Sequence, residues 1–256
     1  MNRPTSKATL IIVLVLALAI IGLVFYLRSG TPAIQNPLPT PDGQVSSEWP
    51  STIVKDVTIK EDTSYYSIDA VYPQVKDDVI TGYFKTFVTD AIAQFKDDTS
   101  WAKGNGADVA PAEAGSLSLE VKYTEQKTSR ADNFTFSIVT YTGGAHGLQA
   151  TKTFSFSSTG QQIMLASLFK NGDTGLKTIA PYVRQQLSKE PGANTQMISD
   201  GTVPTEANFQ NFVVTDAGIT FIFDPYQVAP YSSGTQTVEV PLSAFKSVAS
   251  PDIFGK

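Results

Sequence analysis

Residues 64–98, SYYSIDAVYPQVKDDVITGYFKTFVTDAIAQFKDD, change from one hydrophobic period to another in the middle of the stretch. Over 64–75 apolar and polar residues alternate, and β-branched and aromatic residues are frequent, which indicates a strand. Over 77–98 the apolar residues recur at spacings of three and four, which predicts a helix with one apolar stripe. Asp77 and Asp78 fall in its first turn, where the helix dipole favours negative charge. The stretch therefore indicates a region that combines sheet and helix.

The rest of the chain after residue 50 shows the same two kinds of pattern. Further strands are predicted at 54–59, 117–125, 133–141, 150–157, 212–215, 219–223 and 237–240. Helices are predicted at 165–170, from about 173 to 189, and near the C-terminus. Pro181 is expected to kink the second of these or delay its start. Because strands and helices come in blocks and do not alternate strictly, we expect an α+β fold with antiparallel sheets and packed helices.

The N-terminal segment has a different character. Residues 8–27, ATLIIVLVLALAIIGLVFYL, contain no charge, and as a helix they would span roughly 30 Å, the thickness of a bilayer's hydrocarbon core. Arg3 and Lys7 precede the run, so the positive-inside rule predicts a cytoplasmic stub over 1–7. A cleaved signal peptide is the alternative, but it normally has a shorter apolar region and a small-residue cleavage site.

We therefore expect a single-pass protein of the cell membrane, with its N-terminus in the cytoplasm and its C-terminal region extracytoplasmic. A Pro-rich linker over 28–50 would follow the transmembrane helix.

The composition excludes several kinds of site. The chain of 256 residues has no cysteine and one histidine, which excludes disulfides, thiolate nucleophiles, zinc–thiolate sites and His-rich metal sites. We expect neither a metal nor a cofactor. Residues 51–256 contain 16 Lys and Arg against 22 Asp and Glu, which argues against nucleic-acid binding. The acidity fits a cationic partner, although it also serves solubility.

The single histidine lies in Tyr141-Thr-Gly-Gly-Ala-His-Gly147, at the end of a predicted strand. Gly143 and Gly144 suggest backbone with positive φ, and loops of this kind often serve sites. The alternative is a tight turn in which His146 bonds to the local backbone. No G-x-S-x-G or P-loop motif accompanies it.

A second candidate segment is 226–234, YQVAPYSSG, which places two tyrosines five residues apart around a proline. Exposed tyrosines stack on sugars or partner surfaces, whereas buried ones are structural. The candidate ligand-binding residues are therefore Tyr141, Gly143, Gly144, His146, Tyr226 and Tyr231. No residue is assigned as catalytic, because no nucleophile motif is present.

These segments, taken in order, resemble a known pair of domains. The second half resembles the C-terminal domain of RsiV-type anti-sigma factors and PdaC-type peptidoglycan deacetylases. The segments that carry this resemblance are 141–147, 158–160 (STG), 165–169 (LASLF), 208–223, 226–231 and 238–242 (VEVPL). Residues 54–125, with Tyr72-Pro73 in a strand before a long helix, resemble the PdaC-type domain that precedes it.

The resemblance implies a PdaC-like domain over 51–145 and an RsiV-like domain over 146–256. It also implies that deacetylase chemistry resides in a separate domain with its own aspartates and histidines, so we expect the chain not to be an enzyme. The expected function is a membrane-anchored extracytoplasmic binding module for cell-wall glycan or for a cationic wall-associated protein such as a lysozyme-type hydrolase. A cell-wall hydrolase or deacetylase that uses His146, or a purely structural envelope protein, is the alternative.

Overall fold

The computed structural model describes residues 48–101, 117–171 and 174–255. The predicted cytoplasmic stub, the transmembrane helix over 8–27 and almost all of the linker lie outside these residues. Within the described part of the chain, no helix is both long and apolar enough to cross a membrane. The chain divides into a unit Met1–Ser46 and a unit Ser47–Lys256, and the second unit carries every element described below.

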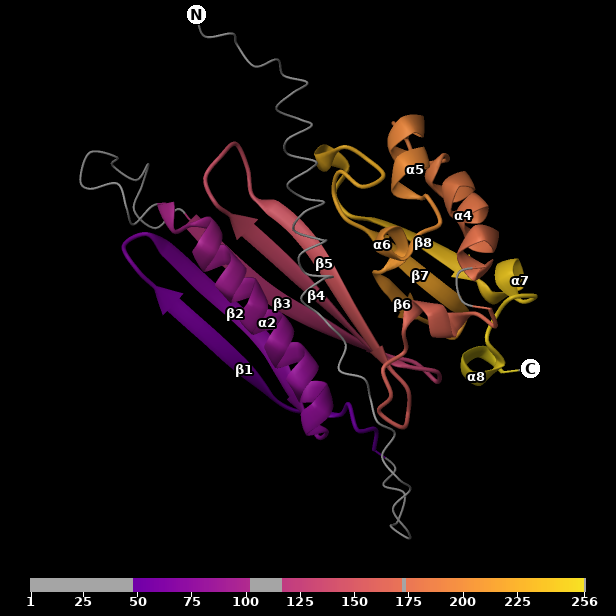
Figure 1. Ribbon diagram of the computed structural model, residues 1–256, viewed down its shortest axis with the longest axis horizontal. Helices are drawn as coiled ribbons and strands as arrows, with labels where there is room; N and C mark the ends of the chain where they lie inside the picture. The colour runs from indigo at the N-terminus through magenta and orange to yellow at the C-terminus, as the bar shows by residue number, and fades with distance from the viewer. Residues whose placement is uncertain (1–47, 102–116, 172–173, 256) are drawn as a thin grey trace, which may run out of the picture. The chain divides into compact units, whose positions relative to one another are not determined.

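The larger of two sheets has five strands in the order β1-β2-β3-β4-β5 (Figure 1). They are β1 (Ile53–Asp62), β2 (Tyr66–Val75), β3 (Leu117–Lys127), β4 (Asp132–Tyr141) and β5 (Leu148–Phe156). Three of the strand pairs are antiparallel, but β2 and β3 are parallel. The prediction of purely antiparallel sheets is wrong at this pair, because helix α2 (Asp78–Asp98) intervenes between the two strands, as parallel neighbours require.

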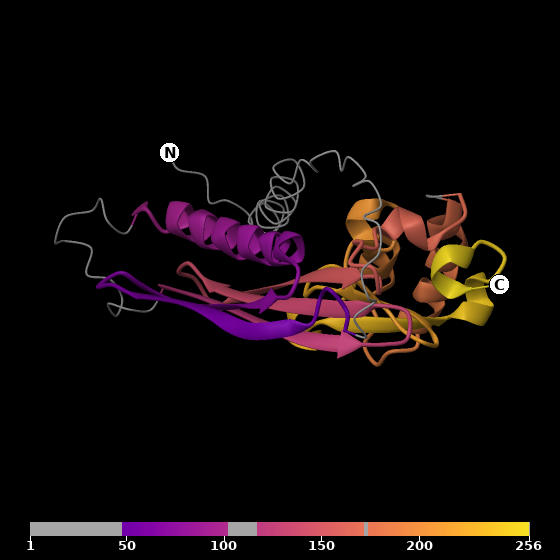
Figure 2. The same ribbon diagram turned by 90° about the horizontal axis from the view of Figure 1, so that it is seen from below.

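Helix α2 lies along one face of this sheet (Figure 2). The carboxylate of Asp77 caps the helix by accepting hydrogen bonds from the backbone N–H groups of Val79 and Ile80. The buried residues follow the predicted stripe: Ile80, Phe84, Val88, Ala91 and Phe95. The Phe84 ring meets four phenylalanines of β4 and β5, with ring centroids 4.7–5.7 Å apart. Aromatic packing between helix and sheet therefore forms the first core.

The second sheet is antiparallel and has three strands, β6 (Phe212–Val214), β7 (Gly218–Phe223) and β8 (Gln236–Pro241). Its core is covered by short helices: α4 (Thr174–Leu187), α5 (Thr195–Gly201), α6 (Glu206–Phe209), α7 (Leu242–Phe245) and α8 (Pro251–Phe254). The helix predicted at 165–170 is only a 3-10 turn at Leu165–Leu168. Pro181 lies inside α4 and does not delay its start. The α+β class with packed helices is confirmed.

The two sheets are joined by a buried polar contact between β4 and β5 on one side and β6 on the other. We call it the Asn133 junction. The Asn133 side chain accepts from the backbone N–H of Val214 and donates to the Val214 carbonyl, at 2.9 and 3.0 Å. It also accepts from the Ser155 hydroxyl and donates to the Gln126 carbonyl. Every hydrogen-bonding position of this amide is thus occupied.

The predicted domain boundary at 145/146 remains a prediction. Strand β5 follows that boundary in sequence, but it is hydrogen-bonded to β4 from Leu148 to Phe156. The first sheet therefore includes a strand that the sequence assigned to the second domain.

Candidate functional site

The loop between β4 and β5 carries His146. Gly143 and Gly144 have φ of +92° and +143°, a region that residues with a β-carbon rarely adopt. The Tyr141 hydroxyl donates to the Gly144 carbonyl at 2.9 Å, which ties the loop to the end of its strand. The glycine pair therefore does what the sequence predicted, since it lets the chain turn and present His146 at the surface.

The imidazole of His146 has a defined tautomer. Its Nδ1 lies 2.8 Å from the Gly147 carbonyl, and because a carbonyl only accepts, Nδ1 carries the proton. Nε2 is then an acceptor, and the Tyr226 hydroxyl lies 3.3 Å from it and donates. The side chain is exposed, so a water molecule or a ligand can reach Nε2 once the Tyr226 hydroxyl turns away from it.

Both tyrosines of the 226–234 segment contact this histidine. The Tyr231 ring stacks on the imidazole with centroids 4.0 Å apart and planes at 21°, and its hydroxyl donates to the Gly147 carbonyl at 2.8 Å. The Tyr226 and Tyr231 rings are 5.5 Å apart. One carbonyl therefore accepts from both His146 and Tyr231, which fixes the two rings against each other.

Tyr226 is the one non-glycine residue of the described part of the chain with positive φ, at +72°. A residue held in this region costs about 1–3 kcal/mol, and such strain clusters at functional sites. A tight turn holds it there, in which the Tyr226 N–H donates to the Ala229 carbonyl at 3.0 Å. The Gln227 side chain anchors this turn by donating to the carbonyls of Gly201 and Asn208.

Asp224 lies two residues before Tyr226 and was not among the predicted site residues. Burial raises the pKa of its carboxyl group, and hydrogen bonds from Thr151 of β5 only partly oppose this shift. Its Oδ1 atom is buried and has no hydrogen-bond partner among the described residues. The sequence could not predict that this acidic residue, at the end of a predicted strand, is buried, because its burial depends on contact with β5.

The structure brings three of the six predicted residues into direct contact: His146, Tyr226 and Tyr231. We call them the His–Tyr cluster. Tyr141, Gly143 and Gly144 shape the loop without contacting the imidazole in any described interaction. Trp101, which the sequence reading missed, lies beside Gly143, with a ring atom 3.7 Å from the position of an added β-carbon, and is 50% exposed. The described residues contain no group of three or more His, Asp or Glu that could hold a metal ion.

The arrangement has the elements of acid–base chemistry. A neutral imidazole with its Nδ1–H fixed by a carbonyl presents Nε2 as a base, and a phenol hydroxyl beside it is a proton or hydrogen-bond donor. The α+β fold thus brings segments that are distant in the sequence together into one exposed site.

Two family models match this chain in succession. Residues 59–149 match the model of deacetylase PdaC, and residues 166–243 match that of DUF3298, a protein family of unknown function. A match to the PdaC model is thus followed along the chain by a match to the DUF3298 model. This confirms the resemblance to PdaC-type proteins, whereas the RsiV-type resemblance of the second half remains a prediction.

Two of the similar proteins have enzymatic names. The peptidoglycan-N-acetylmuramic acid deacetylase PdaC of Bacillus subtilis is 24% identical over 253 residues, which are 95% of this chain and 51% of that protein. The esterase Rv3036c of Mycobacterium tuberculosis is 34% identical over 109 residues, 42% of this chain and 47% of the esterase. The chain thus spans about half the length of the curated relatives it matches.

A solved structure shares the fold. The crystal structure of a DUF3298 family member from Bacteroides fragilis gives a TM-score of 0.55 at 16% identity, and the match covers 80% of this chain and 98% of that one.

The expectation that the chain is not an enzyme is contradicted by these relatives. One is named a deacetylase and the other an esterase, and both names describe the removal of an acyl group. The expectation relied on the single histidine, on the absence of a nucleophile motif and on the separate domain to which the resemblance assigns deacetylase chemistry. A base whose partner tyrosines lie 80 or more residues away leaves no local motif, so the missing motif was not a sufficient reason.

Proposed function

We propose that this chain acts at the cell envelope and hydrolyses acyl groups carried by a cell-wall glycan, with the His–Tyr cluster as its reactive site. The observation that carries the proposal is the state of His146, whose Nδ1 donates to Gly147 while Nε2 accepts from Tyr226. The deacetylase and esterase names of the relatives support it, because amide and ester hydrolysis share one acyl-transfer chemistry.

The first step of this chemistry is attack by water. His146 Nε2 takes a proton from a water molecule as the oxygen bonds to the acyl carbon, and the imidazole becomes an imidazolium. The Gly147 carbonyl accepts the Nδ1–H bond and stabilises that cation, in the way that an orienting group stabilises the histidine of a triad. The Tyr226 hydroxyl turns from Nε2 to the acyl oxygen and donates to the developing oxyanion.

The second step is collapse of the tetrahedral intermediate. The bond between the acyl carbon and the sugar oxygen or nitrogen breaks, and the imidazolium returns its proton to this leaving group. The products are a carboxylic acid and a free hydroxyl or amine on the glycan. The atoms and protons of the two steps balance with water as the co-reactant, so no external cofactor is required.

The test is release of acetate from acetylated peptidoglycan by the purified full chain. His146→Gln is expected to lower the rate by about 100-fold or more, and Tyr226→Phe by about tenfold, because each removes one acid–base or oxyanion contact. Tyr65→Phe is the matched control, since it removes a hydroxyl from an exposed tyrosine outside the cluster. A His146→Gln protein that stays folded by circular dichroism and releases acetate at the native rate would overturn the proposal.

The location is part of the same proposal and depends on the apolar run at 8–27 and its flanking charges. Protease added outside spheroplasts should digest the region after the anchor while a cytoplasmic marker survives. Full protection of that region would show the opposite orientation.

The predicted partner, a cationic wall-associated protein such as a lysozyme-type hydrolase, also remains a prediction. It depends on the excess of acidic residues over 51–256, 22 Asp and Glu against 16 Lys and Arg, and on the RsiV-type resemblance. Binding to lysozyme should weaken between roughly 50 and 300 mM salt, because the Debye length falls over that range. Absence of binding at low salt would leave wall glycan as the ligand.

A further inference from the structure

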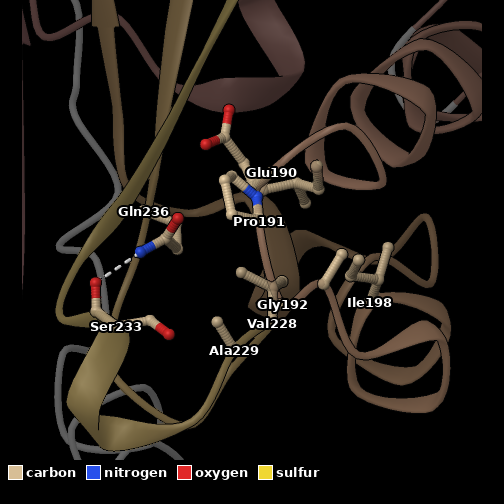
Figure 3. A pocket seen from close by; sticks show the side chains of 10 residues that line it. Glu190, Pro191, Gly192, Ile198, Val228, Ala229, Ser233 and Gln236 are labelled. Atoms are coloured by element: carbon tan, nitrogen blue, oxygen red, sulfur yellow. Dashed lines mark hydrogen bonds between the residues drawn. The ribbon is translucent and has the colours of Figure 1, made fainter.

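The segment that carries Tyr226 and Tyr231 also lines a pocket of about 250 Å³ (Figure 3). Val228, Ala229 and Ser233 contribute one wall, and Gln236 of β8 continues it. The opposite wall comes from the end of α4, the turn 190–193 and Ile198 of α5. Figure 3 shows Glu190 at one edge, with Gln236 and Ser233 across from Ile198. This volume suits a fragment the size of one side chain, since sites for larger ligands are usually about 300–1,000 Å³.

The floor of the pocket is apolar. Leu187, Ile198 and Val228 are 3%, 4% and 1% exposed, and all three belong to the core of the second sheet. A ligand that enters the pocket therefore meets hydrocarbon first, and an aliphatic group gains most from contact with it.

The polar groups at the edge are acceptors. The Gln236 amide Nε2 donates to the Ser233 carbonyl at 2.6 Å, so its Oε1 is turned away from that bond and is left to accept from a ligand. The Glu190 carboxylate has no hydrogen bond or ion pair with any described residue. Among the described residues that line the pocket, none is Lys or Arg. The pocket thus combines one negative charge and further acceptors with an apolar floor.

We propose that this pocket binds a primary alkylammonium group, the end of a lysine or other diamino-acid side chain in a short wall peptide. The methylene stem lies on Leu187, Ile198 and Val228, and the ammonium donates to the Glu190 carboxylate and to Gln236 Oε1. An anionic ligand is disfavoured by Glu190, and a purely aliphatic ligand makes no use of the two acceptors. The inference goes beyond the acyl chemistry of the His–Tyr cluster and does not depend on it.

The experiment is a titration of the full chain, by isothermal titration calorimetry in low salt, with two matched probes. Nα-acetyl-lysine methylamide carries the amine, and Nα-acetyl-norleucine methylamide has the same stem without it. The lysine probe is expected to bind about threefold to fivefold more tightly, which is what a partly exposed ion pair contributes. Equal binding of the two probes would overturn the inference.

Variants locate the binding. Glu190→Gln should remove the preference for the lysine probe, whereas Glu239→Gln, which removes an exposed charge on β8 outside the pocket lining, should keep it. Ala193→Trp, at the exposed turn, should weaken both probes by filling the pocket. A preference that survives both Glu190→Gln and Ala193→Trp would show that the amine binds elsewhere and would sink the proposal.

The two proposals fail separately. His146→Gln should leave the preference for the lysine probe unchanged, because the His–Tyr cluster does not line the pocket. Loss of amine selectivity in a chain that still releases acetate rejects only the pocket. Selective amine binding in a chain that releases no acetate rejects only the hydrolase.

Discussion

The segments that match the PdaC and DUF3298 models are in contact at several places, and two of these contacts have opposite character. At the Asn133 junction, a side chain that is 1% exposed has all of its hydrogen bonds made. At the His–Tyr cluster, an exposed imidazole meets a tyrosine with positive φ, and Asp224, two residues from that tyrosine, has a buried oxygen without a described partner. The Asn133 side chain itself leaves no hydrogen-bonding position empty, whereas the cluster contains a strained backbone position, and such strain is common where a protein acts.

The largest expected effect is at the Asn133 junction. Asn133→Ala removes the acceptor of the buried Val214 N–H and of the buried Ser155 hydroxyl, and each buried group left without a partner costs about 1–3 kcal/mol. We therefore expect a loss of about 3 kcal/mol or more in the free energy of unfolding, measured by urea denaturation. The control is Asn208→Ala, which removes two hydrogen bonds from an exposed amide and should cost under about 1 kcal/mol. Equal losses in the free energy of unfolding for Asn133→Ala and Asn208→Ala would show that the Asn133 junction stabilises the fold no more than an exposed amide does.

The His–Tyr cluster should respond less in stability and more in activity. Tyr231→Ala removes the ring stacked on His146, and an aromatic pair of this kind contributes about 0.5–1.5 kcal/mol beyond burial. We expect a comparable loss of stability, together with a fall in acetate release, because the imidazole loses its neighbour. Tyr65→Ala, at a tyrosine 38% exposed, controls for removal of a surface ring. A Tyr231→Ala protein as unstable as Asn133→Ala would mean that the cluster is structural.

The contrast also explains what the sequence could and could not predict. Helix α2 and most strands follow local periods, and four of the five buried residues of α2 (Ile80, Phe84, Val88 and Phe95) were on the predicted stripe, whereas Ala91 was not. Short helices such as α5, with seven residues, have only about two turns. That is too few for the spacing of apolar residues in a helix to be recognised. The parallel pairing of β2 with β3 depends on how α2 packs and not on either strand.

Residue types were easier to predict than their partners. The sequence singled out His146, Tyr226 and Tyr231 from glycine, proline and aromatic patterns. It could not show that segments 80 residues apart would stack, because only the docking of the two sheets brings them together. Asn133 was recognised as the start of a strand, and Asp224 was not recognised at all, since burial decides the role of each.

The smallest expected effect concerns Asp224, and its sign depends on pH. Burial raises the pKa of this carboxyl group above its usual 3.8, so the folded chain favours the protonated form. Below pH 3.8 the group is protonated in both folded and unfolded chains, and its favourable contribution is fully present. As the pH rises through the raised pKa, the folded chain has to ionise a buried group and that contribution is lost.

Asp224→Asn keeps the shape of the side chain and can still accept from Thr151, but it cannot ionise. The variant should therefore be more stable than the native chain near neutral pH by on the order of 1 kcal/mol, and the difference should vanish as the pH falls toward 3.8. Thermal denaturation of both proteins between about pH 4 and pH 8 measures this difference. If Asp224→Asn were less stable at neutral pH and lost acetate release, the ionised carboxylate would belong to the working site, and the strained turn beside it would serve to hold that charge.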